Sequence, residues 1–166
     1  MKSNKGFSLV ELVVVIAIMA ILATVATISI RAIFGTQAKE CARNIESQLN
    51  NVRVKTMGKN SVTLEIYKGA DGAYYSNAIT NKGQSDEFSN EKKIGKSRVE
   101  VSYSLSEDYS GKKTLEVGDK IVVEFDRSSG AVKESGGKCC SRIWVSQGNT
   151  EKIITIYKET GKVEYE

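Results

Sequence analysis

A single acidic side chain, Glu11, lies in an otherwise uncharged apolar stretch near the start of the chain. Residues 6–30 read GFSLVELVVVIAIMAILATVATISI, and no side chain from residue 12 to residue 30 carries a charge. A run of about 20 apolar residues has the length of a helix that crosses a bilayer. A charged group inside such a segment is costly and normally marks a function. The position of Glu11 therefore predicts a functional role for its carboxylate.

The residues before the apolar run are few and basic, with Lys2, Lys5 and a final Gly6. A secretory signal peptide begins in this way, but its apolar core of about 7–15 residues is shorter than the run seen here. A plain transmembrane anchor would keep both lysines in the cytoplasm and the rest of the chain outside. That second interpretation fits the length of the run but leaves Glu11 unexplained.

Residues 5–34 resemble the N-terminus of type IV prepilins and of type II secretion pseudopilins, because Gly6, Phe7 and Glu11 occupy the places that this family fixes. The resemblance implies that a prepilin peptidase cuts the Gly6–Phe7 bond and that the new terminal residue, Phe7, is N-methylated. It also implies that Glu11 meets the amine of Phe7 in a neighbouring subunit, or in its own chain. A buried charge left unpaired is costly, so such a pair favours one register of assembly.

The resemblance and the apolar pattern divide the chain into three parts. Residues 1–6 are the expected leader peptide, residues 7–58 a long helix, and residues 59–166 a β-rich globular head. We expect residues 7–30 of the helix to span the membrane and later to form the filament core, and residues 31–58 to be amphipathic. The apolar side chains that recur at three- and four-residue steps in the second half are Ala38, Cys41, Ala42, Ile45, Leu49 and Val52.

The head shows short runs with period-two alternation of apolar and polar residues, separated by turn residues such as Ser128-Ser129-Gly130 and Thr160-Gly161. This pattern predicts an antiparallel sheet with one wet face, and hence an α+β, pilin-like fold with the helix packed on the sheet. We expect hairpins near 119–134 and 152–165, and an exposed polar loop over residues 77–98. The predicted strands are residues 62–67, 99–105, 121–125, 131–132, 143–145, 153–157 and 163–165.

Three cysteines are present: Cys41 on the apolar side of the helix, and the neighbours Cys139 and Cys140. A disulfide is possible if the head lies outside the membrane. Cys41 joined to either partner would close a loop of about a hundred residues, worth about 4 kcal/mol in the chain-entropy model. The alternative is that Cys41 is simply a small buried apolar residue.

Catalytic and metal chemistry have little support in this sequence. The chain has no histidine, and its cysteines lack the paired spacing of a zinc site. Asp126 with Glu134, or Asp86 with Glu87, could be imagined as calcium ligands, but no calcium-loop spacing surrounds them. We therefore expect no enzyme activity, no metal and no cofactor.

The net charge of +4 raises the question of DNA binding, since some pilins take up DNA. Lys133 and Lys138 form one small basic cluster. Acidic residues lie among the members of the other cluster, which weakens it as an electrostatic footprint for DNA. The members of that other cluster are Lys92, Lys93, Lys96 and Arg98.

The leading interpretation is a structural subunit of a type IV pilus, major or minor, that serves adhesion, surface motility or DNA uptake. Its partners would be other pilin subunits, the prepilin peptidase/methyltransferase and the inner-membrane assembly platform. The chain would be a single-pass protein of the cell membrane before assembly and part of an extracellular filament on the bacterial surface afterwards. Two alternatives are a type II secretion pseudopilin and a membrane-anchored binding module that never polymerises.

Overall fold

The chain folds as an N-terminal helix followed by antiparallel β-sheets, which confirms the predicted α+β class. The computed structural model describes residues 8–58, 60–106, 111–134 and 139–166, except for the side chains of residues 25–34. Helix α1 runs from Leu9 to Met57. Two compact units divide the chain, Met1–Phe34 and Gly35–Glu166. The second half of the helix thus belongs to the same unit as the sheets.

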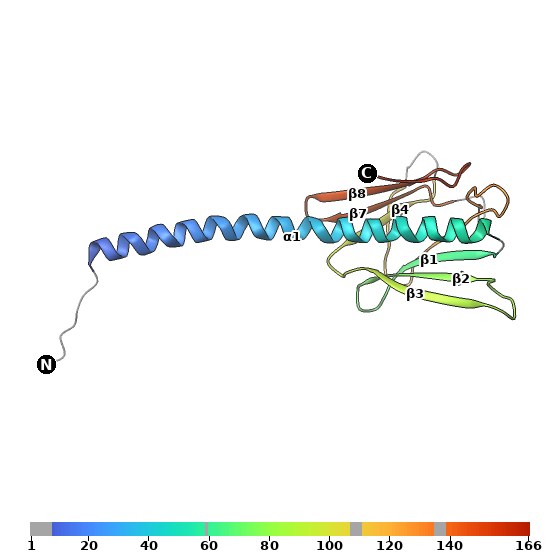
Figure 1. Cartoon of the computed structure of the whole chain (residues 1–166), viewed down its shortest axis with the longest axis horizontal. Coiled ribbons are helices and arrows are strands. Elements are labelled where there is room, and N and C mark those ends of the chain that lie inside the picture. Colours follow the sequence, from blue (N-terminus) through green and yellow to red (C-terminus); the bar gives the residue numbers. More distant parts are fainter. Residues whose placement is uncertain (1–7, 59, 107–110, 135–138) are drawn as a thin grey trace. The chain divides into compact units, whose positions relative to one another are not determined.

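The described part of the second unit holds nine strands in two sheets (Figure 1). A four-stranded sheet has the order β3-β2-β1-β6, and a five-stranded sheet has the order β5-β4-β7-β8-β9. Every pairing between named strands is antiparallel. The strands are β1 (Val62–Lys68), β2 (Tyr74–Thr80), β3 (Phe88–Gly95), β4 (Glu100–Ser104), β5 (Lys113–Thr114), β6 (Lys120–Glu124), β7 (Arg142–Gln147), β8 (Thr150–Ile156) and β9 (Val163–Tyr165).

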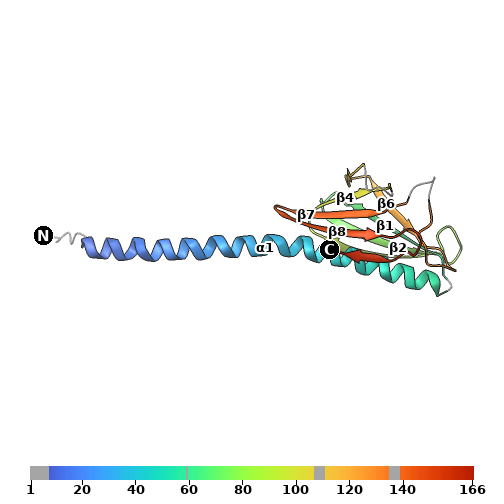
Figure 2. The same cartoon turned by 90° about the horizontal axis from the view of Figure 1, so that it is seen from above.

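The C-terminal part of α1 lies along both sheets (Figure 2) and contributes the predicted apolar stripe to the core. Each of the six stripe residues, from Ala38 to Val52, is at most 1 % exposed. They pack with the inward residues of β1, such as Leu64 and Ile66, and with Ile143 of β7. A polar contact also joins the layers, because Asn44 Nδ2 donates to the carbonyl of Ile94 at 3.1 Å. The periodicity read from the sequence is therefore the packing surface of the helix.

The predicted loop over residues 77–98 is wrong, because β2 and β3 form a hairpin there. On β2 the inward side chains include Ser76 and Ala78, which are small or polar, so the alternation is hard to see in the sequence. β3 is the terminal strand of its sheet, and its first six side chains are exposed. An edge strand with water on both faces needs no apolar period and often carries charges. The sequence also predicted one sheet where the structure has two.

The predicted hairpin at 152–165 is present as β8 paired with β9, whereas residues 131–132 form no strand of their own. Phe125 and Val132 make only an isolated bridge. The bridge is flanked by hydrogen bonds from the Lys133 amide to the carbonyl of Glu124 at 2.8 Å and from the Asp126 amide to the carbonyl of Ala131 at 2.7 Å, so the predicted hairpin near 119–134 is present in a short form. The Val132 amide donates to the carbonyl of Lys158, just beyond β8, at 2.8 Å, so the same segment also joins the two sheets.

The possible disulfide between Cys41 and the C-terminal pair is absent, and all three cysteines are buried and in the reduced state. Cys41 faces Gly95, where an added Cβ would come within 2.6 Å of its Sγ. Cys139 lines a hollow with Thr160, whose carbonyl accepts a hydrogen bond from Arg53 at 2.8 Å. Arg53 lies twelve residues after Cys41 on α1, about 18 Å along the helix. A disulfide requires Cα atoms within about 7 Å, so the cysteines are at different ends of the core.

Burial makes the thiols of Cys41 and Cys140 poor nucleophiles. It raises the pKa of both Cys41 and Cys140 to about 12. The thiolate is the reactive form, and it is scarce at neutral pH when the pKa is this high. Cys41 therefore acts as the small apolar core residue that was the alternative interpretation.

Candidate functional site

Glu11 lies in the first turn of α1. The helix begins with ordinary backbone geometry, since the Leu12 amide donates to the carbonyl of Ser8 at 3.1 Å. A carboxylate near a helix N-terminus is favourable because the free amides there carry partial positive charge. Glu11 is exposed, and it is the only charged residue among residues 8–24. The local fold thus presents one carboxylate on an otherwise uncharged helical surface.

The side chains around Glu11 on this helix are apolar on every side and largely exposed. Eleven large apolar side chains between Leu9 and Leu22 are 47–79 % exposed. A helix that is apolar all round is normally buried, either in a large core or in a membrane. Its own unit, as far as it is described, supplies no layer to cover it. This surface therefore calls for a covering that lies outside the described fold of one chain.

The expected membrane span covers residues 7–30. Within the part of the chain that the structure describes, no helix combines the length and the apolar character that a membrane crossing requires. Residue 7 and the side chains of residues 25–30 lie outside the described residues. The span stays a prediction from the sequence.

Residues 1–27 match the family model described as the prokaryotic N-terminal methylation motif. The chain carries the prepilin-type motif of type IV pilins and pseudopilins. No curated protein and no solved structure matches the chain. The prepilin-type motif supports a pilin- or pseudopilin-type protein that is processed by a prepilin peptidase and assembles with other such subunits.

The prepilin-type motif includes Gly6 and Phe7, the predicted cleavage and methylation residues, which lie outside the described residues. Glu11 is described and follows Gly6 by five positions. The roles of these three residues in cleavage, methylation and register stay predictions. What the structure adds is the exposed apolar surface that surrounds Glu11 on α1.

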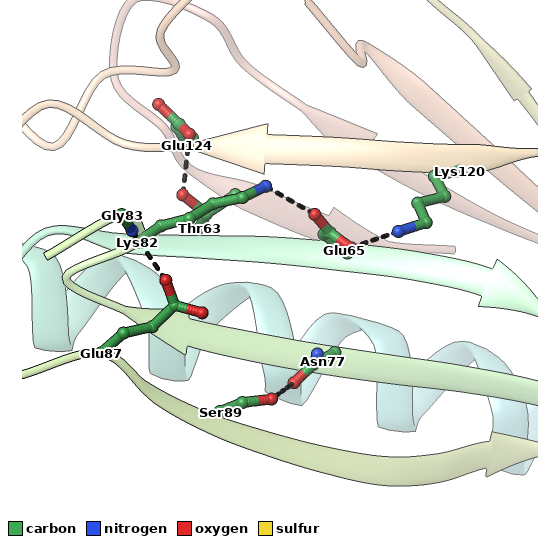
Figure 3. Close-up of polar contacts among 9 residues, drawn as sticks. All are labelled: Thr63, Glu65, Asn77, Lys82, Gly83, Glu87, Ser89, Lys120 and Glu124. Atoms are coloured by element: carbon green, nitrogen blue, oxygen red, sulfur yellow. Dashed lines mark hydrogen bonds and ion pairs between the residues drawn. The ribbon is translucent and has the colours of Figure 1, made fainter. Parts of the chain in front are cut away.

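The head carries a second polar arrangement, on the face of the four-stranded sheet that points away from the core. Alternate residues of a strand point to opposite faces, so Glu65 of β1 points outward while Leu64 points into the core. The carboxylate of Glu65 lies between two lysines (Figure 3), with Lys82 at 2.7 Å and Lys120 at 2.9 Å. The hydrogen bond from Lys82 is the largest cause that lowers the pKa of Glu65. Glu65 thus ties the loop after β2 and the start of β6 to the central strand.

The ion pairs of Glu65 with Lys82 and Lys120 stabilise the fold and explain how its charged side chain can be buried. The side chain of Glu65 is 9 % exposed, whereas those of Lys82 and Lys120 are about half exposed. Next to it, Thr63 donates to Glu124 Oε1 at 2.7 Å, and the Gly83 amide donates to Glu87 at 2.7 Å. These contacts bring together β1, β6 and the loop between β2 and β3, which the sequence pattern did not link, because an alternating pattern shows which face a side chain takes but not its partner on another segment.

Replacement of Glu65 by glutamine is expected to lower the free energy of unfolding by about 1–3 kcal/mol at pH 7, since it removes two charge-assisted hydrogen bonds. Because folding lowers the pKa of Glu65 from 4.5, its stabilisation is present above pH 4.5 and is lost as the pH falls through the lowered value. Urea denaturation at pH 7 and in acid should therefore show a smaller pH dependence for Glu65→Gln than for the wild type.

The matched control is Glu116→Gln, because Glu116 pairs with Lys68 at 3.5 Å but is 66 % exposed. An exposed pair contributes little to stability. Equal losses of stability for the two variants at pH 7 would contradict the role assigned to Glu65.

Aromatic and cationic side chains continue along the same outward face. The rings of Tyr67 and Tyr75 stack with centroids 5.9 Å apart, and Lys93 lies over the Tyr75 ring at 5.6 Å. The Tyr67 hydroxyl donates a hydrogen bond to the Glu91 carboxylate, and this bond raises the pKa of Tyr67 to about 12. The face is therefore a closely paired polar exterior.

The carboxylates considered as calcium ligands form hydrogen bonds and ion pairs with other groups of the protein. The carboxylate of Asp126 accepts hydrogen bonds from Ser128 and Ser129, which hold its pKa well below the ordinary range. Glu134 pairs with Lys158 at 2.6 Å. The Asp86 carboxylate accepts a hydrogen bond from the Asn81 side chain at 2.7 Å, and the Glu87 carboxylate accepts one from the Gly83 amide. Among the residues that the structure describes, no group of three or more such ligands could hold a metal ion.

The basic cluster at the end of β3 is partly assembled in space. Lys93, Lys96 and Arg98 line one hollow, together with Gln37 of α1. Lys92 is not among its lining residues, as expected for the neighbour of Lys93 on a strand, where successive side chains point to opposite faces. Lys133 lies in another part of the head, and Lys138 is outside the described residues.

Proposed function

We propose that this protein is a structural subunit of a type IV pilus filament, cleaved after Gly6, N-methylated at Phe7 and assembled through the N-terminal part of α1. The observation that carries the proposal is the all-round apolar surface from Leu9 to Leu22, with Glu11 as its single charge among the described residues. An exposed apolar surface of this size marks a membrane or protein interaction. The membrane covers it before assembly, and the helices of other subunits cover it afterwards.

This surface is large enough that it must be kept out of water, in the membrane first and in the filament core afterwards. Full burial of one large apolar side chain contributes about 1.5–3 kcal/mol. Eleven such side chains, each about half exposed or more, correspond to a gain on the order of 10 kcal/mol. That gain matches the whole folding stability of a typical domain. Glu11 adds little net energy, but its need for a partner selects the register.

In this proposal the head forms the filament exterior and has no catalytic role. Its outward sheet face consists of paired charges and stacked tyrosines, which suits contact with water. The protein is held in the cell membrane before assembly and is exposed on the bacterial surface afterwards. A pseudopilin of a type II secretion system shares the prepilin-type motif, and filaments that persist outside the cell distinguish a pilin from it.

The mature N-terminus tests the proposal. Mass spectrometry of the protein from sheared filaments should show a chain that starts at N-methylated Phe7 and lacks residues 1–6. In cells without the prepilin peptidase, the chain should keep Met1 and stay in the membrane. A mature start further along, within residues 17–27, would indicate ordinary signal-peptide cleavage and would overturn the proposal.

A further inference from the structure

A cation-lined hollow lies at the turn between β3 and β4. Its volume is about 460 Å³, and its charged lining residues are Lys93, Lys96, Arg98 and Asp71. The turn is closed by the Val99 amide, which donates to the carbonyl of Lys96 at 3.2 Å. Two cationic side chains therefore flank Ser97 on one short turn and line the same hollow.

The carboxylate that lines this hollow, that of Asp71, already has hydrogen-bond and ion-pair partners. Asp71 accepts hydrogen bonds from the Tyr75 hydroxyl at 2.8 Å and the Ala73 amide at 3.0 Å, and it pairs with Lys93 at 3.4 Å. None of the described residues forms an ion pair with Lys96 or Arg98. Glu40 adjoins the site across a smaller neighbouring hollow of about 120 Å³, and Glu100 lies beyond Arg98 in another one. After the Lys93–Asp71 pair is subtracted, the hollow keeps two unpaired positive charges.

One lining residue of this hollow follows the predicted end of the membrane span closely along the sequence. Gln37, which lines the hollow, follows Ile30 by seven residues. Seven residues reach at most about 25 Å even when fully extended. Anionic phospholipids attract basic groups near the bilayer surface, with about 1 kcal/mol for each lysine or arginine.

We propose that this hollow binds the phosphate headgroups of anionic phospholipids and so holds the head against the membrane before assembly. The inference rests on the proposed function, because it requires the subunit to be anchored in a bilayer. DNA is the less favoured polyanion, since DNA binding commonly uses six to ten phosphate contacts and this site offers about two. Extraction into a filament would break the lipid contacts and release the head.

Hydrogen exchange of the full chain in vesicles tests the inference. Amides of residues 93–99 should exchange about thirtyfold more slowly in mixed phosphatidylcholine and phosphatidylglycerol vesicles than in phosphatidylcholine alone, the factor that corresponds to two basic contacts. The double variant Lys96→Gln/Arg98→Gln should lose this difference, and so should the wild type in about 1 M salt. The control Lys55→Gln/Lys133→Gln makes the same charge change elsewhere, with Lys55 about 27 Å along α1 from Gln37, and should keep the difference.

The other outcomes are separable. Equal exchange in both kinds of vesicle, from protein that floats with them, would overturn the inference and leave the proposed function standing. Protein that fails to float with either vesicle would overturn both. Slower exchange caused by inorganic phosphate in phosphatidylcholine vesicles would assign the hollow to free phosphate. Protection by a short DNA duplex without phosphatidylglycerol would assign it to nucleic acid, and either result would overturn the lipid assignment.

Discussion

Filaments are expected to be lost when Glu11 is replaced by glutamine. Glutamine keeps the size and most of the polarity of the side chain but removes the charge that the Phe7 amine would meet in the assembled state. Removing one partner of a buried ion pair costs about 3–5 kcal/mol, because the other charge stays buried and unpaired. A loss of that size at each subunit contact lowers the contact equilibrium constant by about two to four orders of magnitude. Electron microscopy and quantification of sheared filaments measure the effect.

The matched control is Glu40→Gln, which removes the same charge from an exposed position on the same helix. It should leave filament yield unchanged. Both variants should be cleaved to mature chains and should reach the membrane in wild-type amounts. Wild-type filament yield from Glu11→Gln would show that Glu11 sets no register.

Replacement of Gly161 by alanine is expected to disrupt the head more than the same change at any other described glycine. Gly161 follows β8 in the turn before β9 with φ at 61°, and a Cβ there would lie 1.8 Å from the carbonyl oxygen of Gly130. That oxygen also accepts a hydrogen bond from Arg53 Nε at 3.3 Å, and Arg53 donates to the Thr160 carbonyl at 2.8 Å. The methyl group would therefore force apart two turns that α1 clamps together.

Gly148→Ala is the matched control, because Gly148 has a nearly equal φ of 58° in the hairpin between β7 and β8 but has no atom within 4 Å of the added Cβ. The control should cost about 1 kcal/mol, the strain of a left-handed backbone alone. Overpacking at Gly161 should cost about 3 kcal/mol more and lower the Tm by about 10 °C beyond the control. Near-ultraviolet circular dichroism of Trp144 during heating of the full chain in detergent measures both. Equal Tm values for the two variants would show that the turns can separate freely.

The sequence was informative where a physical period or a fixed motif was present. The stripe from Ala38 to Val52 follows the helical repeat, so its burial could be predicted before the fold was known. Most strands of the head showed period-two alternation for the same reason. β3 could not be recognised, because an edge strand with exposed side chains has no apolar face to reveal it.

Contacts between distant residues were beyond the reach of these patterns. Glu65 and Lys82 are surface residue types without a period, and only the folding of the loop after β2 brings them together. The unpaired charges of Lys96 and Arg98 likewise emerge only when Asp71 is seen to be engaged by Lys93 and Tyr75. Charge clusters read from sequence cannot show which members are already neutralised.

The sequence by itself determined the prediction of N-terminal processing, because the motif of a glycine, a following phenylalanine and a lone acid in an apolar run depends only on the order of residues along the chain. Only the tertiary structure decided the state of the cysteines and the arrangement of the head. Cys41 and Cys139 looked like partners because their residue types allow a bond, but a bond also requires proximity. Proximity follows from how α1 packs on two sheets, and that packing places Gly95 beside Cys41 and Thr160 beside Cys139.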